Sequence, residues 1–120
     1  MRVIRKRPGE KAEIINIANT LQALQTEVGG GIDAIASRCD NIVVIFNSRG
    51  KQIEGYQFSM AVESATHKIT DCIAGTAILV GAMEDDFIDL TDAMCAKYIK
   101  LLNDPERVAS TYDNCPVIQL

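Results

Sequence analysis

Side chains that could carry out chemistry are few in this sequence, and they are spread along the chain. The only histidine, His67, lies in THKIT and has no special spacing to a cysteine or to a serine elbow. Nucleophilic catalysis needs a nucleophile with a base positioned beside it. The sequence therefore gives no positive sign of an enzyme, and we expect a non-enzymatic protein in which His67 is an exposed or core-edge residue.

Metal-binding patterns are also missing. The four cysteines are scattered without a CxxC pair: Cys39, Cys72, Cys95 and Cys115. A zinc site normally uses closely spaced cysteine and histidine ligands. Asp85, Asp86 and Asp89 do not have the spacing of a calcium loop, so we expect a solvated acidic turn there. We predict no metal and no cofactor.

A small anionic ligand, such as a nucleotide, is a chemistry that the sequence can accommodate. One or two bases are enough to orient such a ligand in an otherwise apolar pocket. Arg49 lies in the turn-like SRGK, and the region Tyr56 to Asp71 has the least regular pattern of the chain. Binding residues favour irregular connections on a rigid scaffold. The candidate ligand-binding residues are Arg49, Tyr56, His67 and Thr70.

Three consecutive glycines, Gly29 to Gly31, raise the possibility of a phosphate-binding loop. In such loops the glycines lead from a strand into the positive amino end of a helix. Here they follow the apolar positions of a short helical segment, where a left-handed residue ends a helix. We therefore interpret them as a helix stop. A stop alone does not require three glycines.

The composition of the 120 residues is that of one globular domain, with 48% hydrophobic and 23% charged residues. A net charge of -4, no tryptophan and 5% aromatic residues argue against nucleic-acid binding. No apolar stretch approaches the roughly 20 residues of a membrane span. Free buried thiols fit a reducing cytoplasm. The alternative is a disulfide bond between Cys72 and Cys115.

Charge is unevenly distributed along the chain. Five bases lie within the first eleven residues, and five acids lie between Glu84 and Asp92 with no base among them. Charge runs of this kind usually form solvated edges. The alternative is a pair of complementary patches that meet between subunits, and the sequence does not decide between the two.

The first half of the chain predicts strands, a short helix and a buried strand. The expected strands are Arg2 to Lys6 at a sheet edge, Ala12 to Ile17, IDAIAS after the glycines, and the fully apolar Ile42 to Phe46. The helix is expected to begin at an Asn19 cap with Gln22 completing a capping box. Leu21, Leu24 and Val28 would form its apolar face.

The second half predicts a weaker strand near Gln52 to Gln57, one helical turn at Met60 to Ser64, and a second apolar strand from Asp71 to Gly81. Gly75 within that strand marks a bulge or a close approach. Thr91 should cap a helix that ends at Asn103 and packs on the sheet through a wide apolar stripe. Residues 104–120 form a possible docked tail.

The order of the segments NTLQALQTEVGG, FNSRGK, IAGTAILVG and FIDLTDAMCAKYIKLL resembles a known family. The chain is similar to small phage and mobile-element proteins catalogued only as a domain of unknown function, with the pattern TL..LQ..VGG, N..GK, I.GT..IVG and LTD..I.KY over roughly residues 1–103. The resemblance implies a phage, plasmid or bacterial source and supplies no catalytic residues. Phe58 to Ala61 replaces an Asn-Arg-containing segment that is usual in that family.

Taken together, these patterns predict one α+β domain over residues 1–120. We expect a single antiparallel or mixed sheet of about five to six short strands with two main helices packed on one face. The expected function is a protein-interaction module that binds an unknown protein partner as a homodimer. The alternative is a module that binds or sequesters a small anionic, nucleotide-like ligand, and the second alternative is an enzyme.

Overall fold

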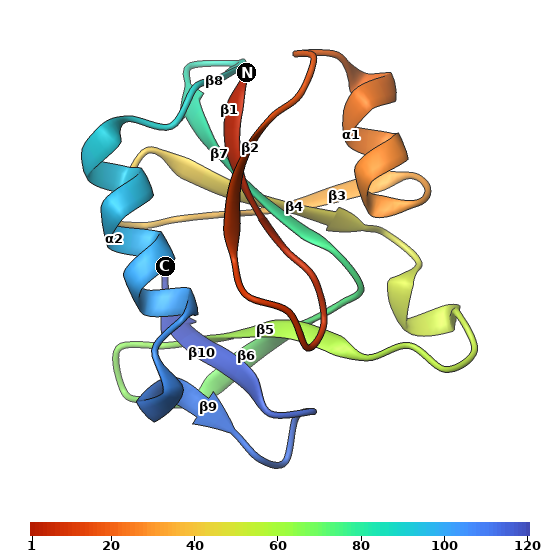
Figure 1. The fold of residues 1–120 in the computed structure, drawn as a ribbon, viewed down its shortest axis with the longest axis vertical. Coiled ribbons are helices and arrows are strands. Elements are labelled where there is room, and N and C mark those ends of the chain that lie inside the picture. The colour runs from red at the N-terminus through yellow and green to blue at the C-terminus, as the bar shows by residue number, and fades with distance from the viewer.

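The computed structural model describes residues 1–120, which form two α-helices and ten strands in two sheets (Figure 1). The first sheet has the order β2-β1-β7-β4-β3, and β8 pairs with β7. All its neighbouring strands are antiparallel. Its strands are β1 (Arg2–Lys6), β2 (Glu13–Asn16), β3 (Ile32–Ala36), β4 (Ile42–Asn47), β7 (Ala77–Met83) and β8 (Asp86–Ile88). The α+β class is confirmed, and the single sheet is wrong.

The second sheet has the order β6-β5-β10-β9 and uses the end of the chain. Its strands are β5 (Phe58–Glu63), β6 (Ile69–Ala74), β9 (Val108–Ala109) and β10 (Cys115–Gln119). Strand β10 runs parallel to β5 and antiparallel to β9. Residues 104–120 are thus more than a docked tail, because β10 is an inner strand of this sheet.

Gly75 divides the apolar run that the sequence predicts as one strand. The run becomes β6 and β7, which belong to different sheets. Gly75 has a φ of 77°, in the left-handed region that a side chain disfavours. Periodicity alone cannot detect the break, because Ile73 and Ala74 before the glycine and the residues from Ala77 to Val80 after it are all buried and apolar.

Two predicted elements before Gly75 are also wrong. Residues Gln52 to Gln57 are not a strand, since a 3-10 helix η1 (Gly50–Gln52) and a turn occupy this part of the chain. The predicted helical turn at Met60 to Ser64 lies mostly in β5, where every residue from Ser59 to Val62 is buried. The run is short and apolar on both faces, and such a run does not distinguish a strand from a helix by its period.

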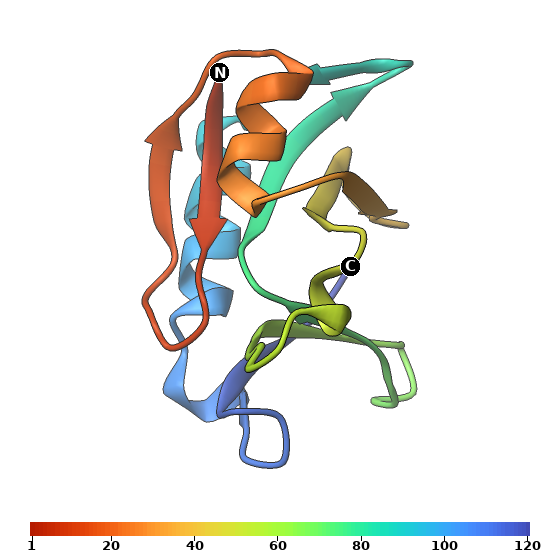
Figure 2. The same cartoon turned by 90° about the vertical axis from the view of Figure 1, so that its right-hand side faces the viewer.

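The helices cover opposite faces of the first sheet, so the prediction of two helices on one face is wrong. Helix α2 (Asp92–Leu102) packs Tyr98 in one core with Ile4 and Leu79. Helix α1 (Leu21–Val28) packs Leu24 in a separate core with Val3 and Ile78. Successive residues of a strand point to opposite faces. Figures 1 and 2 show β1 and β7 lying between the two helices.

Helix α1 begins one residue later than the sequence suggests. Thr20 caps it, with its Oγ1 accepting from the Ala23 N–H at 3.1 Å. Asn19 instead donates its side-chain amide to the Phe87 carbonyl oxygen at 3.0 Å. Leu21 is 58% exposed and does not belong to the apolar face, which consists of Leu24 and Val28. The α2 prediction is confirmed at both ends, with Thr91 as its cap and Asn103 after its last turn.

The glycine run after α1 is a helix stop, as predicted, and the structure explains its length. Gly29 ends the helix with a φ of 82°. A Cβ on Gly30 would lie 3.0 Å from Nδ2 of Asn47, and one on Gly31 would lie 3.2 Å from Oγ of Ser48. That Asn47 amide donates to the Val28 carbonyl oxygen at 3.2 Å. The extra glycines therefore let the end of β4 approach and cap the helix.

The basic amino-terminal residues pair within the chain. Arg2 binds Asp92 at 2.7 Å, and Arg5 binds Glu13 at 2.7 Å and Glu27 at 3.1 Å. Strand β1 lies between β2 and β7, so its predicted edge position is wrong. The basic and acidic segments thus meet within the chain only at Arg2, because the acids that bind Arg5 lie outside the acidic segment. No helix is long and apolar enough to cross a membrane.

Candidate functional site

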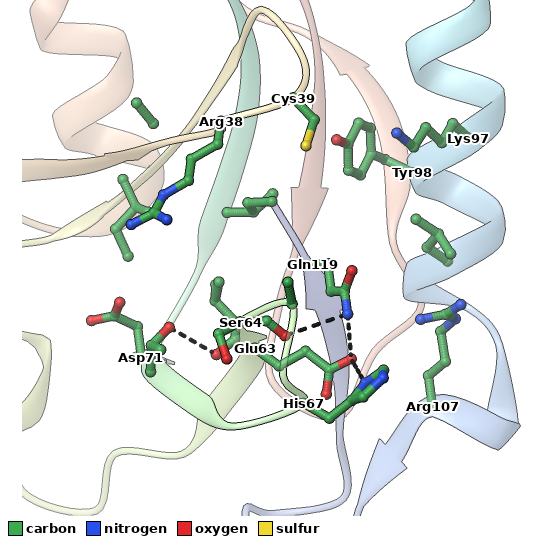
Figure 3. A pocket seen from close by; sticks show the side chains of 17 residues that line it. Arg38, Cys39, Glu63, Ser64, His67, Asp71, Lys97, Tyr98, Arg107 and Gln119 are labelled. Carbon is green, nitrogen blue, oxygen red and sulfur yellow. Dashed lines mark hydrogen bonds and ion pairs between the residues drawn. The ribbon is translucent and has the colours of Figure 1, made fainter.

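A cleft with a volume of about 770 Å³ opens where the two sheets and α2 come together. It is formed by the end of β3 and the turn after it, the β5–β6 hairpin, α2 and the end of β10 (Figure 3). Its size is within the range of about 300 to 1,000 Å³ that is usual for small-molecule sites. Ile35, Val62 and Leu101 contribute apolar surface to the lining.

Basic side chains enter the cleft from several elements. Arg38 comes from the turn after β3, Lys97 from α2, and Arg107 from the 3-10 helix η2 (Pro105–Arg107). Arg38 is exposed and takes part in none of the ion pairs within the chain. The Arg107 guanidinium reaches Asp104 only at 3.7 Å. Arg38 and Arg107 are therefore available to an anion.

The floor of the cleft carries a carboxylate. Glu63 has a side chain that is only 17% exposed, and its Oε1 lies 3.4 Å from Nδ1 of His67 and 3.5 Å from Nε2 of Gln119. Both distances are long for hydrogen bonds. In Figure 3, His67 and Gln119 lie beside this carboxylate, with Arg38 on one side of it and Arg107 on the other. Glu63 thus keeps acceptor capacity toward the cleft.

A second acidic group fixes the wall that α2 provides. Oδ2 of Asp40 accepts from the Lys97 ammonium at 2.6 Å and from the Tyr98 hydroxyl at 2.6 Å. The Lys97 hydrogen bond, followed by that of Tyr98, lowers the pKa of Asp40. Burial, and then the bond to Asp40, raises the pKa of the Tyr98 phenol. These bonds tie α2 to the turn after β3, and both of these elements line the cleft.

The structure brings together two of the four residues that the sequence proposes for ligand binding. His67 and Thr70 line the cleft, although the Thr70 hydroxyl already donates to the Val62 carbonyl oxygen at 3.3 Å. Arg49 and Tyr56 do not line it. They flank η1, away from the β5–β6 hairpin that carries His67 (Figure 1).

Sequence reasoning missed most of the polar lining. The missed residues are Arg38, Glu63, Lys97, Arg107 and Gln119. They come from five different elements and share no local spacing. The sequence carries a partial signal for Lys97, because a base toward the carboxyl end of a helix interacts favourably with the helix dipole. That signal describes helix stability and does not indicate a cleft.

A separate aromatic cluster lies at the beginning of β5. The ring of Phe58 lies edge-on to Tyr56 at 5.4 Å and to Tyr112 at 6.0 Å between centroids. The Lys51 ammonium is 5.9 Å from the Phe58 centroid. Ile53 is 54% exposed and Tyr56 is 41% exposed. Tyr56 therefore belongs to a surface cluster of aromatic side chains, apart from the cleft.

The four cysteines are free, including Cys72 and Cys115. Burial raises the pKa of the Cys115 thiol to about 11, which keeps it protonated near neutral pH. No group of three or more histidine, cysteine or acidic side chains is arranged to hold a metal ion.

Comparison with known proteins gives a family without an activity. The family model described as "Domain of unknown function (DUF3846)" matches residues 1–103. No curated protein and no solved structure matches the chain. The family match covers the first sheet, both helices, β5 and β6, and it ends before Arg107 and Gln119 of the cleft.

Proposed function

The chain belongs to the DUF3846 family, a family of unknown function. We propose that the protein binds a small anionic organic ligand in the cleft between its two sheets. The observation that carries the proposal is that Arg38 and Arg107 both line one partly apolar hollow and neither has a short ion pair within the chain. Lys97 also lines the hollow but is paired with Asp40, so the groups left for an anion are the two arginines, which come from separate elements. A few charged groups on apolar surface are typical of ligand sites.

We propose binding without catalysis. His67 is the only imidazole, and its ring contacts the Glu63 carboxylate rather than a serine or cysteine. An activated nucleophile needs a base within hydrogen-bond reach. A site that holds an anion and releases it unchanged requires only the positioned bases and the apolar lining.

Isothermal titration calorimetry tests this function with defined probes. Wild-type protein is titrated with ATP, GTP, CTP, UTP, tripolyphosphate and citrate. We expect at least one probe to bind, and its affinity to fall at least about tenfold in the double variant Arg38→Ala/Arg107→Ala, because hydrogen bonds to charged groups contribute about 1.5–3 kcal/mol each.

The variant Arg49→Ala is the matched control, since it removes an exposed arginine that lies outside the cleft. Its affinity should equal that of the wild type. The proposal is wrong if no probe binds, or if binding is the same in the double variant as in the wild type.

A protein-interaction module is the second candidate, and the exposed aromatic cluster favours it. Tyr56, Phe58 and Tyr112 place aromatic surface together at the beginning of β5, and Ile53, which is also exposed, lies in the turn just before Tyr56. Contiguous exposed apolar surface with aromatic residues is characteristic of protein interfaces. Strand β3 lies at an edge of the first sheet, but it is less suited to pairing with a strand of another chain. The Ala34 N–H of this strand already donates to the Asp33 carboxylate at 2.8 Å.

We propose that this cluster forms a homodimer contact. Light scattering should then give a dimer mass for the wild type and a monomer mass for Ile53→Ser/Tyr56→Ser. A monomer at all concentrations would contradict the contact. A phage or mobile-element source and a cytoplasmic location, which follow from the family resemblance and the free thiols, stay predictions.

A further inference from the structure

Glu63 is an unexpected group in a site for anions. Its carboxylate lies among the bases of the cleft, and its two side-chain contacts are both 3.4 Å or longer. No arginine or lysine pairs with it, because its only ionic contact is with His67. A mostly buried carboxylate of this kind favours a partner that donates hydrogen bonds.

This acceptor restricts the chemistry of the ligand. A simple polyanion is attracted by Arg38 and Arg107 and repelled by Glu63 at the same time. A ligand that carries hydroxyl or amino donors beside its anionic group satisfies all three side chains. Asp71, which also lines the cleft, adds to the repulsion of a pure polyanion.

The bases are not equally divided between the two sides of Glu63. His67, Lys97 and Arg107 lie on the side of α2 and β10, whereas Arg38 lies alone on the opposite side (Figure 3). Of the first group, Lys97 is already bonded to Asp40 and His67 contacts Glu63, so Arg107 is the base available to the phosphates of a ligand. A single guanidinium next to the apolar end of β3 suits a flat aromatic ring, because arginine stacks on aromatic faces.

We infer that the ligand is a 5′-phosphorylated ribonucleoside whose ribose hydroxyls donate to Glu63. The phosphates lie toward Arg107, and the base lies toward Arg38 and Ile35. This inference rests on the proposed function, and it adds the ligand class and a specificity-determining residue. Glu63 recognises the 2′- and 3′-hydroxyls and disfavours an anion without them.

Calorimetric titrations with four ribonucleoside triphosphates, their 2′,3′-dideoxy counterparts and tripolyphosphate test the inference. In the wild type, the ribonucleotide that binds should be at least about tenfold tighter than its dideoxy form, because the dideoxy form lacks the hydrogen bonds from the hydroxyls to the charged carboxylate. Tripolyphosphate should bind more weakly than the ribonucleotide. Arg107→Ala should weaken tripolyphosphate and the nucleotides alike, and Arg38→Ala should weaken the nucleotides more than tripolyphosphate.

The variant Glu63→Gln should lose the preference for ribose and bind tripolyphosphate several-fold more tightly than the wild type. Glu54→Gln is the matched control, since Glu54 is an exposed acid outside the cleft. It should keep both properties. If Glu63→Gln does not fold, the wild-type comparison of ribose with dideoxyribose still decides.

The two possible failures are distinct. Equal affinity for ribo and dideoxy forms, with both weakened by Arg38→Ala/Arg107→Ala, overturns the role of Glu63 and keeps anion binding. Absence of any binding that depends on Arg38 and Arg107 overturns the proposed function itself, and the inference with it.

Discussion

The first sheet with its helices and the cleft below it use polar and glycine residues in opposite ways. In the first sheet, the segments that resemble the family pattern serve the backbone: Thr20 and Thr91 cap helices, Gly29 ends one, and Asn47 binds the Val28 carbonyl oxygen. In the cleft, Arg38 has no ionic partner inside the chain, and the side-chain contacts of Glu63 are long. The residues of the recognisable pattern therefore mainly stabilise the fold, and the groups free to bind a ligand lie mostly outside that pattern.

The Lys-Tyr pair of α2 belongs to both regions. Lys97 and Tyr98 are part of the family-like segment and also line the cleft. Their bonds to Asp40 are short, so their first role is to hold α2 against the turn after β3. A motif residue that lines a cleft can thus have a structural role. Substitutions that change stability can be distinguished from substitutions that change ligand binding, and this difference tests the comparison of the two regions.

Removal of residues 104–120 should have the largest effect on the stability of the folded chain. The family match ends at residue 103, but β10 pairs with both β5 and β9. A chain that ends at Asn103 loses an inner strand and exposes the apolar face of β5. We expect it to show no cooperative unfolding by circular dichroism in urea. A sharp transition like that of the full chain would contradict the importance of β10.

Gly81→Ala should be the most destabilising single substitution among those compared. A Cβ at this position would lie 2.8 Å from the Asp89 carbonyl oxygen and 2.9 Å from Ile88. Overpacking against a backbone that cannot shift costs about 1–3 kcal/mol, and we expect the upper end of that range. Gly55→Ala, where nothing lies within 4 Å and φ is 76°, is the control.

Gly55→Ala should lower the free energy of unfolding by only about 1 kcal/mol, since it carries the left-handed conformation alone. Urea denaturation measures both variants. Equal losses would show that the close approach at Gly81 is unimportant.

Asp40→Ala should come next and should depend on pH. It removes the acceptor of the buried Tyr98 hydroxyl and of Lys97, and we expect a loss of about 2 kcal/mol at pH 7. Because the folded-state pKa of Asp40 is lowered, its contribution is complete above the unfolded pKa of about 3.9 and disappears as the pH falls through the folded value. The difference between variant and wild type should therefore shrink below about pH 4. A difference that is independent of pH would exclude the charge of Asp40 as its origin.

Arg38→Ala should have the smallest effect on stability. Arg38 is exposed and has no ion pair, and surface substitutions of this kind change stability by about 0.5 kcal/mol or less. The same variant should weaken nucleotide binding strongly. A large loss of stability would place Arg38 with the structural residues and remove the distinction between the two regions.

Sequence reasoning found the elements whose signals are local. The cap at Thr91, the stop at Gly29 and the strand Arg2–Lys6 depend on neighbouring residues, and all three are confirmed. The division at Gly75 depends on which sheet each half joins, and the period of the apolar residues does not report that. Two of four ligand candidates lie in the cleft. Arg38 and Arg107 could not be paired from sequence, because only the meeting of the two sheets brings them together.

Nuclear magnetic resonance of the ¹⁵N-labelled protein with added ribonucleoside triphosphate tests the central claim most directly, because it locates binding on the chain. We predict saturable shifts of the backbone amides of Arg38, Glu63, His67 and Gln119, with Arg49 and Lys51 unchanged. Shifts confined to the aromatic cluster around Tyr56, or no saturable shift at all, would contradict a ligand site between the two sheets.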